Sequence, residues 1–279
     1  MPVDKPLKGG RTLIYRHPLL VRLTHWVNLA SMVVLLLSGL QILCAHPGLY
    51  WGDTARFAHP VVSITTWMTG SGETRGALHV AGATFDTTGV LGVSKAADGS
   101  DSERAFPSWL TLPSVLDLGA GRRWHFFFAW LFALNGALYL SAGLLGRRLP
   151  RELWPTREQM AHIGRSVLDH LRLRFPHGDA ARQYNVLQKL VYLPVVFILL
   201  PLMIWTGLTM SPAIDARFHF LSILVGGRQS ARTLHFLSAS ALVLFAMVHV
   251  LMVFAAGPIN EMRSMITGWF VIKPERAEP

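Results

Sequence analysis

The chain has 279 residues, of which 51% are hydrophobic and 15% charged, and its mean hydropathy is +0.37. This composition is too apolar for an ordinary soluble domain, and the formal charge of +10 does not indicate nucleic-acid binding, because the basic residues are scattered between long apolar runs. The single cysteine, Cys44, excludes an internal disulfide, covalent c-type haem attachment and cysteine-rich zinc or iron–sulfur sites.

Four apolar runs are long enough to cross a hydrocarbon core of about 30 Å as helices of about 20 residues. They are predicted at residues 23–44, 124–145, 190–210 and 233–256. The first is too long for a signal peptide and has no A-x-A cleavage site after it, so we expect it to be retained. The expected fold class is an all-α integral membrane protein, with the four spans bundled into one domain over residues 1–279.

The segments between the spans differ in composition. Residues 45–123 are rich in Gly, Ser, Thr and Asp and are predicted to form a long external loop. In the 146–189 loop, residues 157–175 place apolar residues at helical spacing opposite an Arg-rich face, which predicts an amphipathic helix at the membrane surface. Of the 26 Lys and Arg residues, 17 lie in the N-terminal segment, this loop and the C-terminal tail. The positive-inside rule therefore predicts a multi-pass inner-membrane protein with both termini in the cytoplasm.

Four of the twelve histidines lie inside or at the edge of the predicted spans: His25, His125, His235 and His249. An ionisable side chain is costly in hydrocarbon and usually marks a functional site. His235 and His249 are 14 residues apart, about 40° short of four full helical turns, so they share one helix face about 21 Å apart. The fourth helix therefore offers two ligands at different depths.

The helix directions give each of these histidines a partner. His25 begins the first span on the cytoplasmic side, where the fourth span ends with His249, and His125 begins the second span on the external side, where the fourth starts with His235. Two axial imidazoles at each level match a six-coordinate haem b held without covalent attachment, which favours electron transfer over oxygen chemistry. The alternatives are core histidines bonded to backbone or hydroxyl groups, and a zinc site, which would need four ligands together.

Other residues near these levels suit a haem. Gly39 follows His25 by 14 residues, so it is expected to leave space at the depth of the second haem. Arg22, Arg123 and Arg232 lie near the ligands and could pair with haem propionates, the alternative being arginines that reach the membrane surface. Close helix packing is the simpler explanation for three further glycines: Gly136, Gly143 and Gly207.

Several stretches carry a family resemblance. They are "RLTHWVN" (22–28), "RRWHFFFAW" (122–130), "QYNVLQKLVY" (183–192) and the His235/His249 pair. Together they resemble the bacterial cytochrome b561 and nickel–iron hydrogenase cytochrome b family, which includes the cytochrome b subunits of formate dehydrogenases and thiosulfate reductases. The resemblance covers essentially the whole chain. It implies a four-helix core with two b haems that exchanges electrons between a membrane quinone and a periplasmic redox partner.

The resemblance also implies a place for the quinone. By similarity to the formate dehydrogenase subunit, quinone would bind near the cytoplasmic haem, at Asn185, Gln188 and Lys189. The alternative is that these three residues cap the third helix and anchor it at the membrane surface. If replacing all three left quinone-linked haem reduction unchanged, the quinone site would move toward Asn260 and Glu261.

The expected function is an electron relay in the membrane lipid, with no catalytic residue of its own assigned. A molybdopterin oxidoreductase is the first choice of partner, a hydrogenase or cytochrome c the second, and "AHPGLYWG" (45–52) resembles members encoded beside molybdopterin enzymes. The 45–123 segment is longer than the loops of the formate and hydrogenase subunits, so their docking does not transfer. One rival function is a stand-alone superoxide:quinone oxidoreductase, with Arg122, Arg123 and Arg232 as a cationic route. Another is a transporter or scaffold that uses its histidines for protons or metal.

Overall fold

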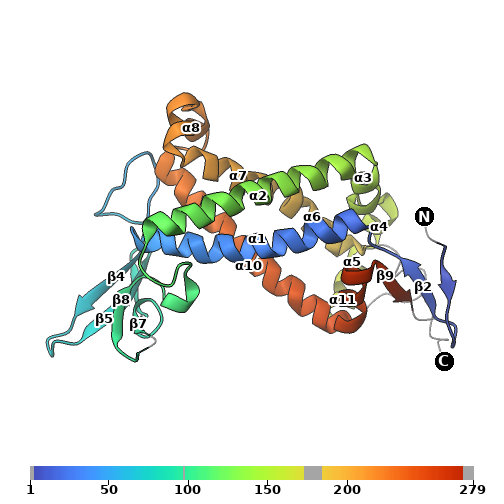
Figure 1. The fold of residues 1–279 in the computed structure, drawn as a ribbon, viewed down its shortest axis with the longest axis horizontal. Helices are drawn as coiled ribbons and strands as arrows, with labels where there is room; N and C mark the ends of the chain where they lie inside the picture. Colours follow the sequence, from blue (N-terminus) through green and yellow to red (C-terminus); the bar gives the residue numbers. More distant parts are fainter. Residues whose placement is uncertain (1–2, 97, 173–183, 273–279) are drawn as a thin grey trace. The chain divides into compact units, whose positions relative to one another are not determined.

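The computed structural model describes residues 3–96, 98–172 and 184–272. Four helical segments in it are long and apolar enough to cross a membrane (Figure 1). They are α1 (Leu19–Cys44), α2 (Leu118–Leu145), the segment Val186–Thr209 and α10 (Arg228–Ala256). The prediction of four spans is confirmed. Each helix begins about one turn or more before its predicted start, because Lys or Arg side chains near the helix start interrupt the apolar run.

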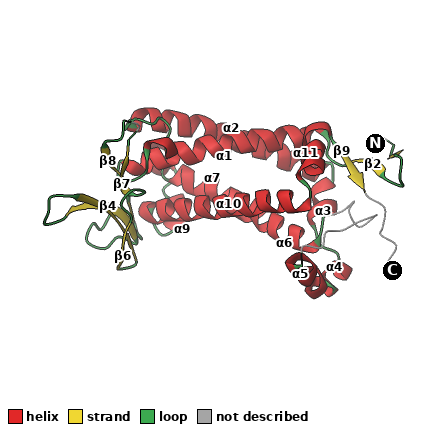
Figure 2. Ribbon diagram, turned by 90° about the horizontal axis from the view of Figure 1, so that it is seen from below, coloured by secondary structure: helices red, strands yellow, loops and turns green. Residues whose placement is uncertain are grey.

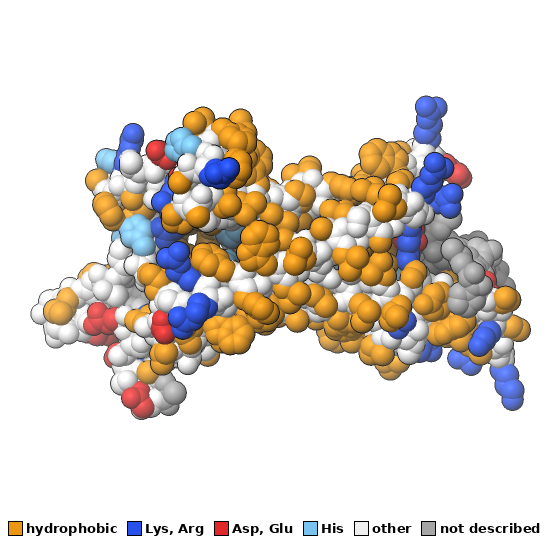
Figure 3. All heavy atoms as spheres, turned by 45° about the horizontal axis from the view of Figure 1, so that its top comes forward, with side chains coloured by type: hydrophobic (Ala, Val, Ile, Leu, Met, Phe, Trp, Pro, Cys, Tyr) orange, Lys and Arg blue, Asp and Glu red, His pale blue; other side chains and the backbone are white. Residues whose placement is uncertain are grey.

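The helices expose apolar side chains and bury small polar ones. Phe127 is 66% exposed and Phe254 65% exposed, whereas Ser31, Ser38 and Thr206 are fully buried. Hydrophobic side chains cover much of the helical surface in Figure 3. This distribution is the reverse of a soluble core, and it suits helices that face lipid and pack against one another through small residues.

The third span is built from three consecutive pieces. These are α6 (Val186–Pro194), the π-helical turn η3 (Val195–Leu199) and α7 (Leu200–Thr209). Pro194 and Pro201 have no backbone N–H, so the regular hydrogen-bond ladder is interrupted, and a π-helical turn accommodates such an interruption without ending the helix. The span therefore continues to Thr209.

The chain divides into two compact units, and the division falls within each of the four spans. The first unit comprises Met1–Asn28, Leu134–Pro201 and Ala241–Pro279, and the second comprises Leu29–Ala133 and Leu202–Ser240. Each span therefore contributes one part to each unit.

In the first unit, segments from both ends of the chain meet in an antiparallel sheet. Its strands, in the order β1–β2–β9, are β1 (Lys5–Pro6), β2 (Thr12–Tyr15) and β9 (Trp269–Ile272). Ile14, Phe270 and Ile272 form the buried core of this sheet. The helix α11 (Pro258–Thr267) leads from α10 into β9.

The 146–189 loop also belongs to the first unit. The single amphipathic helix predicted for residues 157–175 is instead two short helices, α4 (Arg157–Ala161) and α5 (Ile163–Leu171), preceded by α3 (Arg148–Leu153). Thr156 and Gln159 form a capping box that begins α4, and His162 separates α4 from α5. The last three residues of the predicted helix lie outside the described residues.

In the second unit, the predicted external loop contains two antiparallel sheets (Figure 2). Their strands are β3 (Gly48–Leu49), β4 (Val62–Met68), β5 (Thr74–Val80), β6 (Ala83–Asp86), β7 (Gly92–Lys95) and β8 (Asp101–Arg104). The expectation of an all-α chain is therefore wrong for this β segment (residues 48–104) and for the terminal sheet. β-branched and aromatic residues within β4, "VSITTWM", explain its extended conformation. The remaining helices of this unit are short: η1 (Ser108–Leu110), α8 (Pro212–Arg217) and α9 (Phe220–Leu224).

Two glycines allow the strands of the β segment to approach closely. A Cβ atom on Gly76 would lie 2.0 Å from the carbonyl oxygen of Leu91, and one on Gly92 would lie 2.6 Å from that of Thr65. Gly92 also has a φ of 80°, which L side chains rarely adopt. A larger residue at either position would push the backbones apart.

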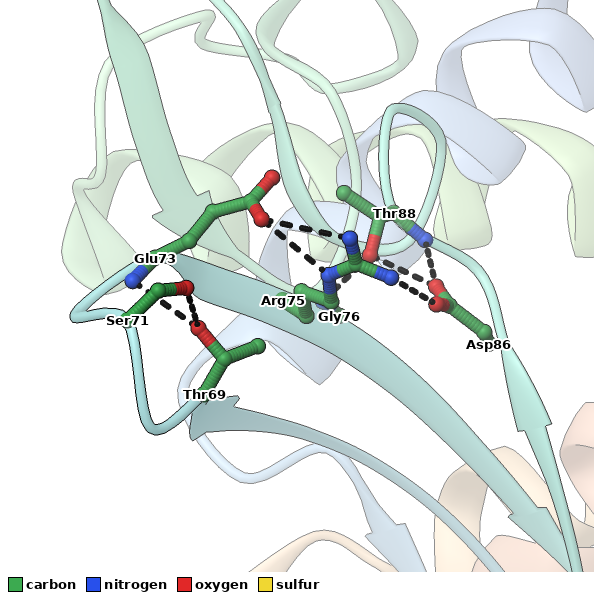
Figure 4. Close-up of polar contacts among 7 residues, drawn as sticks. All are labelled: Thr69, Ser71, Glu73, Arg75, Gly76, Asp86 and Thr88. Carbon is green, nitrogen blue, oxygen red and sulfur yellow. Dashed lines mark hydrogen bonds and ion pairs between the residues drawn. The ribbon is translucent and has the colours of Figure 1, made fainter.

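Exposed polar contacts order the outer end of the β4–β5 hairpin (Figure 4). Arg75 forms ion pairs with Glu73, at 3.2 Å, and with Asp86, at 3.3 Å. The hydroxyl and backbone N–H of Thr88 donate to Asp86 and lower the pKa of its carboxyl group. Such exposed pairs contribute little to stability, so the hairpin depends on its strand pairing.

Buried contacts attach the β segment to α1. Ile64 and Phe106 form an apolar cluster with side chains near the end of α1, including Leu40 and Leu43. Arg104, which is 8% exposed, donates hydrogen bonds to Gln41 Oε1 on α1 at 3.0 Å, to Thr111 Oγ1 at 2.7 Å and to the carbonyl oxygen of Ser114 at 2.6 Å. A buried guanidinium with three oxygen acceptors therefore joins the sheets to the helix.

The segment after α1 also holds the start of α10. Thr233 donates to the carbonyl oxygen of Tyr50 at 2.7 Å, and the backbone N–H groups of Gln229 and Ser230 both donate to the carbonyl oxygen of Gly52. The side chain of Asp53 accepts from the backbone N–H of Arg228 at 3.1 Å. The bonds from Arg228, Gln229 and Ser230 satisfy N–H groups in the first turn of the helix, which have no partner within it.

Candidate functional site

Two histidine pairs lie within the spans, one in each unit. In the second unit, the ring centroids of His125 on α2 and His235 on α10 are 6.2 Å apart, and the ring planes are inclined by 63°. In the first unit, those of His25 on α1 and His249 on α10 are 6.3 Å apart and inclined by 64°. The structure thus brings together the same pairs that the sequence analysis grouped.

The separation of the rings fits one metal ion between them. A metal–imidazole nitrogen bond is about 2.0 to 2.1 Å long, and with about 1.2 Å from each nitrogen to its ring centre, two opposed imidazoles have centroids about 6.4 Å apart. Both pairs come close to that value. Among the described residues, no group of three or more His, Cys, Asp or Glu side chains could hold a metal ion, so the donor sets are pairs, which suit axial ligation better than a tetrahedral zinc site.

Two hydroxyl residues that the sequence analysis did not select contact the His125/His235 pair. Ser38 Oγ on α1 lies 3.1 Å from Nδ1 of His125, and Thr206 Oγ1 on α7 lies 3.0 Å from Nδ1 of His235. In each case Nδ1 is engaged, so the other ring nitrogen, Nε2, is the one available to a metal. The signal in the sequence was the hydroxyl–glycine dipeptides "SG" at 38–39 and "TG" at 206–207.

The glycines of these dipeptides lie beside the same two rings. A Cβ atom on Gly39 would lie 3.3 Å from Cε1 of His125, and one on Gly207 would lie 3.4 Å from Cε1 of His235. Gly39 therefore lies beside the His125/His235 pair, the level expected from the sequence. Gly207 lies beside His235 in the same way that Gly39 lies beside His125. A Cβ atom on Gly136 of α2 would have no atom within 4 Å, whereas one on Gly143 would meet Leu149.

Aromatic side chains surround the His25/His249 pair. Trp26 lies edge-on to His25, with centroids 5.5 Å apart, and Phe245 stacks on His249 at 5.9 Å. The indole N–H of Trp26 donates to the carbonyl oxygen of Met265 at 3.0 Å, which ties α1 to α11. Tyr192 of α6 contacts Phe245 edge-on at 6.1 Å. This pair therefore has an apolar, aromatic setting.

A comparison with known protein families shows which family this chain belongs to. The family model described as prokaryotic cytochrome b561 matches residues 16–268. The chain belongs to the prokaryotic cytochrome b561 family. It is 27% identical over 242 residues to an Azospira oryzae protein provisionally named protein-methionine-sulfoxide reductase subunit YedZ1, with 85% of this chain and 89% of that protein covered. No solved structure matches this chain.

Membership of the cytochrome b561 family gives the chain its general role. It is a multi-pass membrane protein of a family that carries b-type haem and serves as an electron-transfer subunit. The resemblance seen in the sequence is confirmed. The residues of both pairs suit such a group, because each offers two imidazoles from different helices at a separation that admits one iron between them.

The arginines selected in this cytochrome b561 chain have different surroundings. Arg22 donates to the carbonyl oxygen of Ile266, and Arg232 donates to that of His46. Within the described part of the chain, Nε of Arg22 is buried without a hydrogen-bond partner. Arg123 lines an open pocket with Trp124 and Phe127.

The residues selected for quinone in this cytochrome b561 chain are engaged in the helix start. Asn185 accepts from the backbone N–H of Leu187 at 2.9 Å, and Gln188 accepts from that of Asn185 at 3.0 Å, which together form a capping box. Lys189 is 2% exposed, and its Nζ donates to Gln159 Oε1 at 3.1 Å and to the carbonyl oxygen of Trp154 at 3.3 Å. All three side chains therefore make the capping and anchoring contacts that the sequence analysis gave as the alternative.

Proposed function

We propose that this chain binds two b haems, one between His25 and His249 and the other between His125 and His235. It relays electrons between a membrane quinone and a redox protein outside the membrane. The observation that carries the proposal is the presence of two histidine pairs with nearly equal ring separations, 6.3 Å and 6.2 Å, in two different units. Each bound haem would supply a one-electron iron couple, and the paired imidazoles would leave the iron no free position for dioxygen.

The direction across the membrane follows from the charge distribution. The unit with the His25/His249 pair also contains the basic N-terminal segment and the basic 146–172 loop. By the positive-inside rule this unit lies on the cytoplasmic side of a bacterial inner membrane, and the β segment lies on the periplasmic side. Electrons would then pass between a cytoplasmic-side quinone site and a periplasmic partner.

We place quinone beside the His25/His249 pair. Asn185, Gln188 and Lys189 remain candidate contacts by resemblance, and a quinone would have to replace their capping and anchoring bonds. Asn260 is similarly engaged, because it both donates to and accepts from the backbone of Val271. Burial raises the pKa of Glu261, so its carboxyl group holds a proton more readily than an exposed one. Glu261 therefore suits proton exchange with a quinone.

An external oxidoreductase is the proposed partner. The Azospira relative is named as a subunit of a methionine-sulfoxide reductase, which supports a reductase that draws electrons from the membrane. A molybdopterin enzyme is our first choice, and a hydrogenase or cytochrome c remains the alternative. The β segment, which packs on the end of α1, is the surface on which such a partner would be sought.

The relay is tested with the purified, haem-loaded chain. A pyridine haemochrome assay should give two haems per chain. Added quinol should reduce the haem iron, as seen in the absorption spectrum, and an artificial one-electron acceptor should then reoxidise it. One quinol releases two electrons and two protons, so two acceptor molecules should be reduced for each quinol. Reporter fusions at the C-terminus and within residues 95–104 should report opposite compartments.

Three outcomes would contradict the proposal. Absence of haem absorption would favour a transporter or scaffold. Rapid quinone reduction by superoxide, without any partner, would favour a superoxide:quinone oxidoreductase. A periplasmic C-terminus would reverse the assignment of the two pairs to the two sides of the membrane.

The glycines beside His125 and His235 give a further prediction. Gly39→Val and Gly207→Val should each lower the haem content from two per chain toward one and remove the same spectral component, because a Cβ would already lie 3.3 or 3.4 Å from the ligand ring. Gly136→Val is the matched control, since apart from the neighbouring backbone of its own helix no atom lies within 4 Å of its Cβ position. Loss of different components in the Gly39→Val and Gly207→Val variants would contradict the shared site.

A further inference from the structure

Two buried hydroxyl groups hold the rings of one histidine pair and not the other. Ser38 and Thr206 are both fully buried, and their oxygens lie 3.1 and 3.0 Å from Nδ1 of His125 and His235. Among the described residues, neither ring nitrogen of His25 or His249 has a hydrogen-bond partner, and their ring contacts are with each other, Trp26 and Phe245. The two pairs therefore differ in what their Nδ1 atoms meet.

The direction of these hydrogen bonds can be assigned. A hydroxyl group has one hydrogen to donate and two lone pairs to accept with. Ser38 Oγ donates to the carbonyl oxygen of Val34 at 2.6 Å, and Thr206 Oγ1 donates to that of Leu202 at 2.7 Å. With its hydrogen used on the backbone, each hydroxyl is left to accept from Nδ1–H, and the backbone carbonyl oxygens of Leu35 and Met203 also accept from His125 and His235. This arrangement favours a proton on Nδ1 and a lone pair on Nε2 in both rings.

The same arrangement, a hydroxyl residue followed by a glycine beside a histidine ring, occurs twice on different helices. α1 supplies Ser38 and Gly39 to the histidine on α2, while α7 supplies Thr206 and Gly207 to the histidine on α10. In each case the hydroxyl engages Nδ1 and the glycine lies beside Cε1. All four spans thus contribute to this pair, two with ligands and two with the groups that orient them.

We propose that Ser38 and Thr206 are positioning residues that fix the tautomer and ring orientation of His125 and His235 and lower the reduction potential of the haem bound between them. An Nδ1–H that donates a hydrogen bond makes Nε2 a stronger electron donor, which stabilises oxidised iron relative to reduced iron. Because the hydroxyls are buried, water does not compete for these bonds. The inference rests on the proposed binding of two haems.

The test is a redox titration of the purified two-haem protein, followed by absorption spectroscopy. Ser38→Ala and Thr206→Val should each raise the potential of one haem component, the same one in both variants, and leave the other unchanged. Ser38→Thr and Thr206→Ser keep the hydroxyl and should restore a potential near that of the unmodified protein. Ser240→Ala is the control, because the exposed Ser240 makes the same kind of bond to a carbonyl, that of Phe236, and among the described residues it has no hydrogen bond to a histidine.

A second readout separates orientation from simple packing. The electron paramagnetic resonance signal of the oxidised haem depends on the angle between its two imidazole planes, so the signal of the same component should shift in Ser38→Ala and Thr206→Val. If Ser38→Ala loses this haem while Ser38→Thr retains it, the positioning role is also supported.

The inference is overturned if the haem reduction potential shifts no more in Ser38→Ala and Thr206→Val than in Ser240→Ala. It is also overturned if the potential shifts as much in Ser38→Thr and Thr206→Ser as in the variants that lack the hydroxyl. A haem count below two in the unmodified protein would instead defeat the proposed function, so the two failures are distinguishable.

Discussion

Replacing His249 with Ala is expected to reduce the haem content from two per chain to one. His249 and His25 face each other with ring centroids 6.3 Å apart, so a haem held between them as proposed would lose one of its two imidazole ligands when either residue is replaced. Replacement of His25 should remove the same spectral component. Replacement of His125 or His235 should remove the other component, because that pair belongs to the other unit.

The measurement is a pyridine haemochrome assay together with low-temperature absorption spectra of the purified variants. His162→Ala is the matched control, since His162 is exposed and lies on the loop between α4 and α5. Joint loss of one component in the His25 and His235 variants would show that the ligands are paired differently. An unchanged haem count in any of the four variants would exclude that residue as a ligand.

Replacing Arg104 with Met should destabilise the attachment of the β segment to α1 by about 1.5 to 3 kcal/mol, the range for hydrogen bonds made by a charged group. The substitution leaves Gln41 Oε1 and Thr111 Oγ1, which accept from Arg104 at 3.0 and 2.7 Å, without their donor. Chemical unfolding followed by tryptophan fluorescence gives the free energy, and limited proteolysis shows whether the β segment is exposed first.

Arg75→Met is the control for Arg104, because Arg75 makes ion pairs on the exposed outer hairpin rather than on α1. It should leave the unfolding transition unchanged. Equal stability of the Arg104 and Arg75 variants would show that the apolar cluster around Ile64 and Phe106 is sufficient to hold the segment.

The spans and the pairing of the histidines could be predicted because both depend on regularities of the helix. Hydrophobic length identifies a span, and the 14-residue offset between His235 and His249 places them on one face whatever surrounds them. The helix starts were predicted too late, because Arg22, Lys189 and Arg232 end the apolar run although the helical hydrogen bonds continue past them.

The β segment was missed for a different reason. Strands β4 and β5 contain β-branched and aromatic residues, which favour strands. They are embedded in stretches of Gly, Ser, Thr and Asp that are typical of a loop, and nothing local indicates that Arg104 would reach Gln41 on α1, 63 positions away. Pairing at such separations depends on tertiary packing.

Ser38 and Thr206 were missed because serine and threonine commonly bond to the preceding turn of a membrane helix, as both do here. Such a bond within the helix gives no indication of a further contact with a neighbouring helix. The contacts of Ser38 with His125 and of Thr206 with His235 are seen only when the helices are packed together. The capping role of Asn185 and Gln188, in contrast, is local, so the sequence allowed it as an alternative.

Both histidine pairs take one member from α10, the last of the four spans in chain order. A membrane chain is synthesised from its N-terminus, and earlier segments are in place before later ones emerge from the ribosome. His25 and His125 therefore have no partner histidine in the membrane until the residues of α10 have been translated and inserted. If both pairs bind haem as proposed, the haems can be bound only after the fourth helix has been synthesised, and translation arrested before Arg228 would leave neither pair complete.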